Sequence, residues 1–177
     1  MRYRAANSTR QTLQNLLWFQ VCWFTAVLGQ NDWVWLLMLL LIAHLLSQSP
    51  KMGDWPVLIS CAAIGISTDI LLTKLAFFEF SPSPVLAIPV WLMGLWLAFA
   101  GTLSYGLRWL QPHTFLASML GAVFGPLSYY AGMQLGAVQF EHRLFFTMLV
   151  LALVWALLMP LFCYIASHFQ EVKDETN

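Results

Sequence analysis

Long apolar runs alternate with short polar breaks along the whole chain. A membrane-spanning helix needs about 20 apolar residues at a rise of 1.5 Å per residue, and six runs approach or meet that length. They cover residues 11–29, 33–48, 55–77, 85–107, 113–135 and 143–169. The breaks between them are rich in Pro, Gly, Asn and Asp, which form turns. The pattern therefore predicts an all-α integral membrane protein, a six-transmembrane-helix bundle in a single domain over residues 1–177.

The composition agrees with lipid as the main solvent. Of the 177 residues, 60% are hydrophobic and 9% are charged, and the mean hydropathy is +0.71, whereas a soluble domain carries roughly 25% charged residues. The formal net charge is zero, which argues against nucleic-acid binding because that needs a basic footprint. The predicted partners are the lipid bilayer and a lipid or apolar small molecule, and a homo-oligomer is left open.

Basic residues are distributed unevenly between the two predicted sides of the membrane. With six spans both termini share one side, and that side holds six of the eight basic residues: Arg2, Arg4, Arg10, Lys51, Arg108 and Lys173. The other side holds only Lys74 and Arg143. Because cytoplasmic segments are enriched in Lys and Arg, we expect both termini to lie in the cytoplasm.

One carboxylate, Asp69, lies deep inside an apolar run. A charge in a lipid-spanning helix costs at least about 2.5 kcal/mol on insertion scales, and such residues face the bundle interior. Helical steps from Asp69 give a face of small and polar residues: Ala62, Gly65, Thr73 and Ala76. A neighbouring helix can approach such a face closely. We therefore expect Asp69 to point into the bundle.

Helical rise also gives Asp69 a depth. It follows Trp55 by fourteen residues, about 21 Å into a hydrocarbon core of about 30 Å. Similar depths on other helices give the remaining candidates for a ligand pocket in the outer half of the bundle: Gln20, Trp23, Trp91, Tyr129 and Tyr130. The alternative is a structural polar clasp, in which Gln20 and one tyrosine only satisfy Asp69. The sequence does not decide between them.

The fifth run carries two glycine pairs, Gly121-x-x-x-Gly125 and Gly132-x-x-x-Gly136, eleven residues apart. Eleven residues are close to three helical turns, so the four glycines share a stripe. Together with Gly65 they predict close packing between helices. In the sixth run Pro160 lacks the backbone donor that would bond to the carbonyl of Ala156, and this carbonyl is therefore free for another partner.

Groups that carry known chemistry are sparse. Cys22, Cys61 and Cys163 stand singly inside apolar runs, which is typical of core residues and not of a disulfide or metal set. His44 has no partner at a metal or haem spacing and is interpreted as a core histidine bonded to a backbone carbonyl. No catalytic triad, acid pair or phosphate loop is recognisable. We expect no metal and no cofactor, and an enzyme is the less favoured class.

Two stretches carry a resemblance to a known family: residues 89–103 (PVWLMGLWLAFAGTL) and 121–132 (GAVFGPLSYYAG). With Asp69 and the Phe19-Gln20 and Trp23-Phe24 pairs, they resemble the domain-of-unknown-function family numbered 2878. The resemblance implies a small multi-pass protein of the bacterial inner (cytoplasmic) membrane. In that family Asn-His often follows the Thr-Leu of the fourth helix, but this chain has Ser104-Tyr105, which puts a histidine-dependent mechanism in doubt.

Three functions remain open. The first is binding of a lipid or apolar small molecule in the aromatic pocket around Asp69. The second is a small proton-coupled transporter, or a substrate-binding transporter subunit, with Asp69 taking up the proton. The third is a membrane enzyme of lipid metabolism that uses Asp69 with Tyr129 or Tyr130 as acid and base. The Pro-rich connection 77–84 (FFEFSPSP) is either interfacial or a lid over the pocket.

Overall fold

The computed structural model describes residues 2–48, 54–81, 84 and 86–174. The described part folds into α1 (Arg2–Gly29), α2 (Val34–Gln48), α3 (Asp54–Lys74), α4 (Val90–Leu103), α5 (Thr114–Gln134) and α6 (Leu144–Asp174). A 3-10 turn, η1 (Arg108–Leu110), precedes α5. Two short strands, β1 (Phe78–Glu79) and β2 (Gln139–Phe140), pair antiparallel. The prediction of a helical bundle with six helices is therefore confirmed for these residues.

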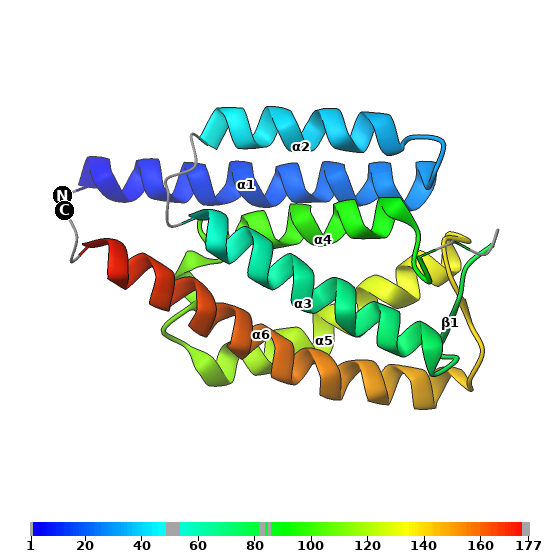
Figure 1. The fold of residues 1–177 in the computed structure, drawn as a ribbon. Helices are drawn as coiled ribbons and strands as arrows, with labels where there is room; N and C mark the ends of the chain where they lie inside the picture. The colour runs from blue at the N-terminus through cyan, green and yellow to red at the C-terminus, as the bar shows by residue number, and fades with distance from the viewer. Residues whose placement is uncertain (1, 49–53, 82–83, 85, 175–177) are drawn as a thin grey trace.

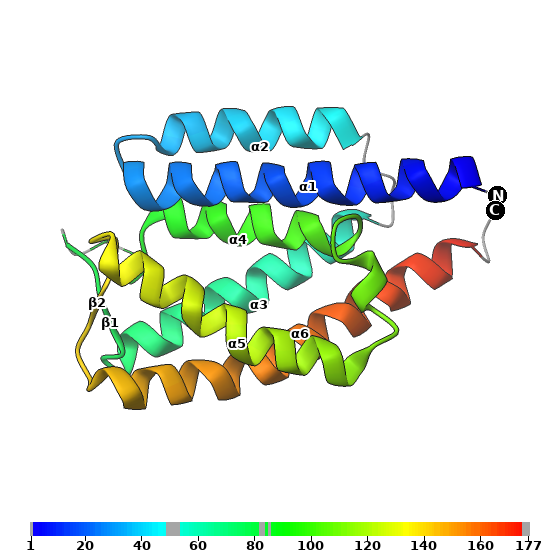
Figure 2. The ribbon, with the colours of Figure 1, turned by 180° about the vertical axis from the view of Figure 1, so that it is seen from behind.

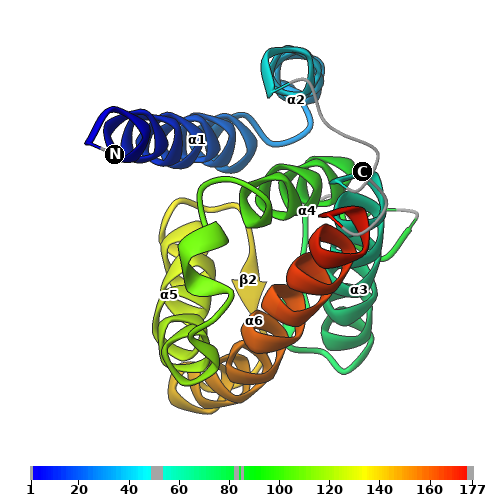
Figure 3. The ribbon, with the colours of Figure 1, turned by 90° about the vertical axis from the view of Figure 1, so that its left-hand side faces the viewer.

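Successive helices run in opposite directions, so α1 begins and α6 ends at the same end of the bundle (Figure 1). Seen along the bundle, α3, α4, α5 and α6 form a four-helix body, and α1 and α2 lie over its α4 side (Figure 3). Helix α4 contacts α1, α2, α3 and α6. The central place of α4 agrees with its content of buried side chains, which include Trp91, Trp96 and Leu103.

Two of the described helices are long and apolar enough to cross a membrane by length and composition: α3 and the 144–169 part of α6. Two further apolar segments, 34–47 and 90–103, are shorter. Large apolar side chains are nevertheless exposed on all six helices, among them Leu17, Leu46, Ile59, Val90, Phe124 and Leu157. Exposed apolar surface of this extent is typical of a face that contacts a membrane or a partner.

The fourth predicted span is longer than the helix in the structure. The sequence predicted a helix over residues 85–107, whereas α4 covers only Val90–Leu103. Pro89 precedes it in an extended conformation (φ −67°, ψ 153°), because proline is best tolerated where no helical donor is needed. Beyond the helix the Leu107 N–H returns to the Thr102 carbonyl (2.8 Å). Some residues that the sequence predictions name lie outside the described residues: Lys51, residues 82–83 and Val85.

The third predicted span also ends earlier than expected, at Lys74 instead of residue 77. The chain turns out of α3 at Ala76, whose φ is +58°, and the Phe77 N–H bonds back to the Leu72 carbonyl (2.9 Å). This is the hydrogen bond that closes a helix C-terminus when one residue adopts a left-handed conformation. Ala76 is therefore exposed and not part of the buried Asp69 face.

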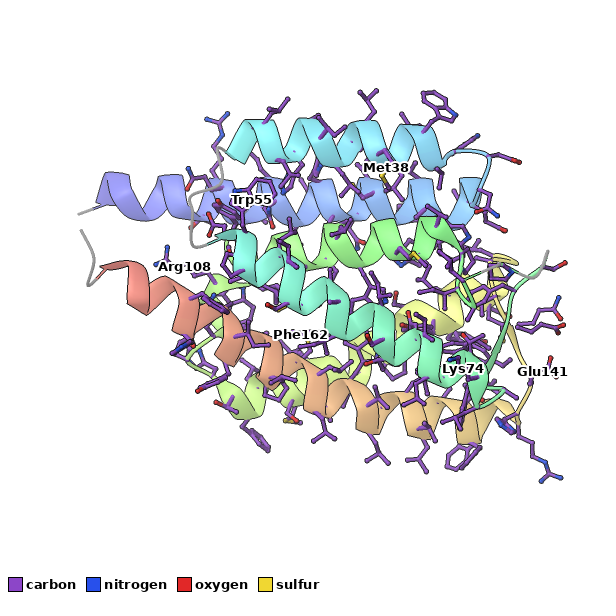
Figure 4. The ribbon with its side chains drawn as sticks, viewed as in Figure 1. Met38, Trp55, Lys74, Arg108, Glu141 and Phe162 are labelled. Carbon is purple, nitrogen blue, oxygen red and sulfur yellow. The ribbon has the colours of Figure 1, made fainter. Side chains whose placement is uncertain are left out.

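The connection after α3 folds over one end of the bundle. Its strand β1 pairs with β2, with Phe78 opposite Phe140 and Glu79 opposite Gln139. Phe77, Phe78 and Phe80 are buried. The described part of the 77–84 connection thus covers the end of the bundle that holds Lys74 and Glu141, opposite the end with Trp55 and Arg108 (Figure 4).

Candidate functional site

Asp69 lies on α3 with no exposed surface. The indole N–H of Trp96 on α4 donates to Oδ2 (2.6 Å), and the hydroxyl of Tyr129 on α5 donates to Oδ1 (2.6 Å). One carboxylate therefore joins three helices. The neighbouring Thr73 hydroxyl bonds only to its own helix, at the Asp69 carbonyl (2.8 Å).

The helix around Asp69 is shaped to admit Trp96. Gly65 lies one turn before Asp69, and a Cβ atom at this position would overlap the Trp96 indole ring. On its other side the Trp96 ring stacks on Trp155 of α6, with ring centroids 5.4 Å apart and planes 11° apart. Phe78 stacks on the Tyr129 ring in the same way (5.0 Å, 7°). Both donors to Asp69 are thus fixed by a hydrogen bond and by a stacked ring.

A small cavity of about 70 Å³ lies against these two rings. Its aromatic lining consists of Phe19, Trp23, Phe80, Trp91, Trp96, Phe99, Tyr129 and Trp155. We call this cavity the aromatic pocket. Asp69 itself does not line it; the carboxylate holds two of the lining rings from behind. Phe80, Ala137 and Val138 close the pocket at the β1–β2 end.

The candidates from the sequence fall into two groups. Trp23, Trp91 and Tyr129 line the aromatic pocket. Gln20 is exposed on α1 and Tyr130 is half-buried on α5, and neither lines this pocket. Asp69 is therefore held by two donors, as the clasp alternative predicts, but Trp96 supplies the donor that Gln20 was expected to supply. We call Asp69, Trp96 and Tyr129 the Asp69 clasp. Whether Asp69 acts on a ligand stays a prediction.

Residues 12–161 match a family that is described as "Protein of unknown function (DUF2878)". The chain belongs to this family. No curated protein and no solved structure matches it. Within this DUF2878 member the family match spans α1 to α6 and includes all three members of the Asp69 clasp.

The glycines of the predicted stripe do not share one role. Cβ atoms at Gly121 and Gly125 would overlap Trp155, and at Gly121 the overlap is with the backbone carbonyl. At Gly132 an added Cβ would meet only Val138, at 3.8 Å. Gly136 lies beyond the end of α5 at φ +75°, where the Ala137 N–H bonds back to the Gly132 carbonyl (2.9 Å). Gly136 therefore forms the turn and does not pack, because the helix ends before it.

Two more residues of the site were not selected from the sequence. These are Trp96 and Trp155. A depth counted along the backbone does not find Trp96, because an indole ring reaches well away from its own Cα. The signal that could have found Trp96 is Gly65. A glycine one turn from a buried carboxylate leaves room for a large ring, and among the large rings Trp has a nitrogen donor and no acceptor.

A second polar cluster lies toward the other end of the bundle. The Asn15 Oδ1 accepts from the Gly106 N–H (3.1 Å), so the Asn15 amide NH₂ faces His44 Nε2 (3.0 Å). His44 Nε2 must then be the acceptor, which fixes a neutral ring with its proton on Nδ1. The prediction that His44 bonds to a backbone carbonyl was wrong, because its partner is the side-chain amide of Asn15. Asn15 and His44 are both buried, and they tie α1 to α2.

Outside the helices two groups have shifted acidity. Burial, and then the hydrogen bond and charge of Asp54, raise the pKa of Tyr105, whose hydroxyl donates to Asp54 (2.8 Å). A hydrogen bond and like charge from Glu141 raise the pKa of Glu79 on β1. Among the described residues no group of three His, Cys, Asp or Glu side chains is placed to hold a metal.

Proposed function

We propose that this chain is a six-span membrane protein with both termini in the cytoplasm, and that its aromatic pocket holds part of a lipid or apolar small molecule. The observation that carries the proposal is a pocket built from eight aromatic rings and no charged side chain. Apolar concavities with a few polar groups are the usual binding sites for small molecules. The exposed apolar side chains on all six helices support a lipid environment.

Asp69 has a positioning role in this proposal. Its two oxygens hold Trp96 and Tyr129 at 2.6 Å, and both rings form the wall of the pocket. A wall whose rings are fixed before the ligand arrives loses less conformational entropy on binding. Asp69 then contributes to ligand binding without touching the ligand.

Transport and catalysis have less support from the same geometry. A transporter that takes up a proton on Asp69 must expose it during its cycle, and here the carboxylate has no exposed surface. A lipid enzyme that uses Asp69 and Tyr129 must release their mutual hydrogen bond (2.6 Å). Both alternatives therefore require Asp69 to leave its hydrogen bonds with Trp96 and Tyr129, whereas binding in the pocket leaves these bonds in place.

Photolabelling in nanodiscs tests the proposal. The protein is placed in phosphatidylethanolamine–phosphatidylglycerol nanodiscs with palmitic acid that carries a diazirine at the chain terminus, and labelled peptides are mapped by mass spectrometry. We expect labels on peptides that contain Trp91, Trp96 or Tyr129. Gly132→Leu should fill the pocket, because an added Cβ meets only Val138 there, and should abolish this labelling.

Gly101→Ala is the matched control for that variant. It also adds a side chain at a helical glycine, where the nearest neighbour would be His44 at 3.9 Å, but it does not line the aromatic pocket. Labelling should persist in this variant. Equal labelling of the native protein and Gly132→Leu would show that the pocket does not hold the probe.

A further inference from the structure

Helices α1 and α5 bound a second, larger cavity. Its volume is about 410 Å³, within the range of about 300–1,000 Å³ that is usual for small-molecule sites. Leu16 and Gln20 line it from α1, and Leu120 and Phe124 line it from α5. Figure 2 shows that α5 leans away from α1 toward its N-terminal end. We call it the α1–α5 groove.

The groove and the aromatic pocket are neighbours. Four side chains line both: Phe19, Phe99, Ser128 and Trp155. Only side chains therefore separate the two cavities, and together they follow α1 from Leu16 to Val27. Eleven residues of helix correspond to about 16 Å, close to half of a hydrocarbon core of about 30 Å.

The lining of the groove selects the chemistry of its occupant. Its polar side chains are uncharged: Gln20, Thr102 and Ser128. The remaining lining consists of aliphatic and aromatic residues, glycine and Met159, so a charged group would lose its hydration there without a partner. The aromatic pocket at the far end, at about 70 Å³, is less than half of a cavity of about 150 Å³ that holds benzene. It has room for the tip of a chain and not for a ring system.

One hydrogen bond crosses between the helices where the two cavities meet. The indole N–H of Trp23 on α1 donates to the Ser128 hydroxyl on α5 (2.9 Å). A second bond, from the Gln30 amide to the Gly136 carbonyl (3.2 Å), links the narrow end. Trp23 lines only the pocket, and Ser128 lines both cavities. A change of the Trp23 rotamer would therefore widen the passage between them.

From these observations we infer that an unbranched aliphatic chain of a membrane lipid enters sideways between α1 and α5, lies along the groove, and places its tip in the aromatic pocket. The Trp23–Ser128 hydrogen bond is the latch that it must pass. This inference rests on the proposed function, since it names the ligand class and route for the same pocket.

The experiment measures how fast the terminal-diazirine palmitic acid reaches the pocket. Nanodiscs that contain the protein are mixed with vesicles that carry the probe and are photolysed after increasing delays. Ser128→Ala removes the latch, and pocket labelling should be about fivefold faster, the factor expected for one lost hydrogen bond. Gln20→Trp places a large ring in the groove and should slow labelling severalfold.

Val21→Trp is the matched control, because Val21 is exposed on α1 and does not line the groove. Its labelling rate should equal that of the native protein. Normal pocket labelling at an unchanged rate in both Ser128→Ala and Gln20→Trp would overturn the lateral route and leave the proposed function standing. Absence of pocket labelling in the native protein would overturn the proposed function itself. A second copy of the chain or another protein crosslinked in the groove would overturn the lipid-chain assignment.

Discussion

The two sides of α5 meet their neighbours in different ways. Toward α6 the helix presents two glycines: Gly121 lies against the Trp155 carbonyl and the Met159 side chain, and Gly125 lies against the Trp155 ring. Toward α1 it presents Leu120, Phe124 and Ser128, and a cavity of about 410 Å³ remains. Backbones approach closely where side chains are small. The same helix therefore builds a tight seam on one side and a groove on the other.

The α6 side of α5 should therefore determine the stability of the protein, and the α1 side should determine how a ligand reaches the pocket. The α5–α6 seam and the Asp69 clasp hold buried rings in one arrangement, so changes there should lower the free energy of unfolding. The α1 side of the groove contributes one latch bond, between Trp23 and Ser128. Changes there should alter ligand exchange more than stability.

Adjacent residues of α5 give the sharpest test. Tyr129→Phe leaves Asp69 Oδ1 without its donor and should lower the free energy of unfolding by about 1–3 kcal/mol, the cost of a buried acceptor left unsatisfied. Ser128→Ala removes a bond between uncharged groups and should cost about 0.5–1.5 kcal/mol. Reversible unfolding in mixed detergent micelles measures both. A larger loss in Ser128→Ala would reverse the comparison.

The seam itself can be broken with a single methyl group. Gly121→Ala should destabilise the protein by about 1–3 kcal/mol through overpacking, because its Cβ would overlap the Trp155 carbonyl oxygen and backbone cannot easily yield. Gly132→Ala is the control on the same helix and should change stability by less than about 0.5 kcal/mol. The same unfolding assay applies. Equal effects at both positions would mean that α5 is not packed as described.

The proline-freed carbonyl gives a smaller test of the seam. The Ser118 hydroxyl on α5 donates to the Ala156 carbonyl on α6 (2.6 Å), the carbonyl that Pro160 was expected to leave free. Ser118→Ala should cost about 0.5–1.5 kcal/mol. Ser167→Ala, which removes a bond within α6 to the Tyr164 carbonyl, should cost less. Equal losses of unfolding free energy in the two variants would mean that the Ser118 bond does not stabilise the α5–α6 seam.

The smallest effect is expected at the β1–β2 end, which closes the pocket. Glu141 raises the pKa of Glu79, so the folded state binds a proton at Glu79 more tightly than the unfolded state does. Stability should therefore fall as the pH rises from about 4.5, the ordinary pKa, through the raised value. Unfolding curves across this range should lose that slope in Glu79→Gln and equally in Glu141→Gln. A slope that persists in both variants would assign it to other groups.

Much of the clasp could be predicted from the sequence, and the reasons are physical. Asp69 stands alone in an apolar run, and the Ala62–Gly65–Asp69 spacing gives its buried face, as observed. Helical rise then predicts the pair Tyr129 and Tyr130 on α5, of which Tyr129 bonds to Asp69. The orientation of α1 could not be predicted because its apolar residues surround the helix, so Gln20 was expected inside and lies exposed.

The two ends of α4 and the aromatic rings around the Asp69 clasp could be found only from the structure. Apolar residues continue past both ends of α4, and hydropathy does not show that the helix begins after Pro89 and ends before Ser104. Trp155 was not a candidate because no polar signal accompanies it on α6. Its place follows from Gly125, whose missing side chain admits the indole, and pairing a glycine with a ring on another helix requires knowing which helices are neighbours.

The Ser118–Ala156 bond has a consequence for how α5 finds its position on α6. Two glycines four residues apart present nearly the same notch, so a partner helix could slide by one turn and still find a small residue. The carbonyl freed by Pro160 occurs at one height on α6, and Ser118 can reach it from one height on α5. Glycine thus permits contact along the stripe, and the serine–proline pair selects a single register for it.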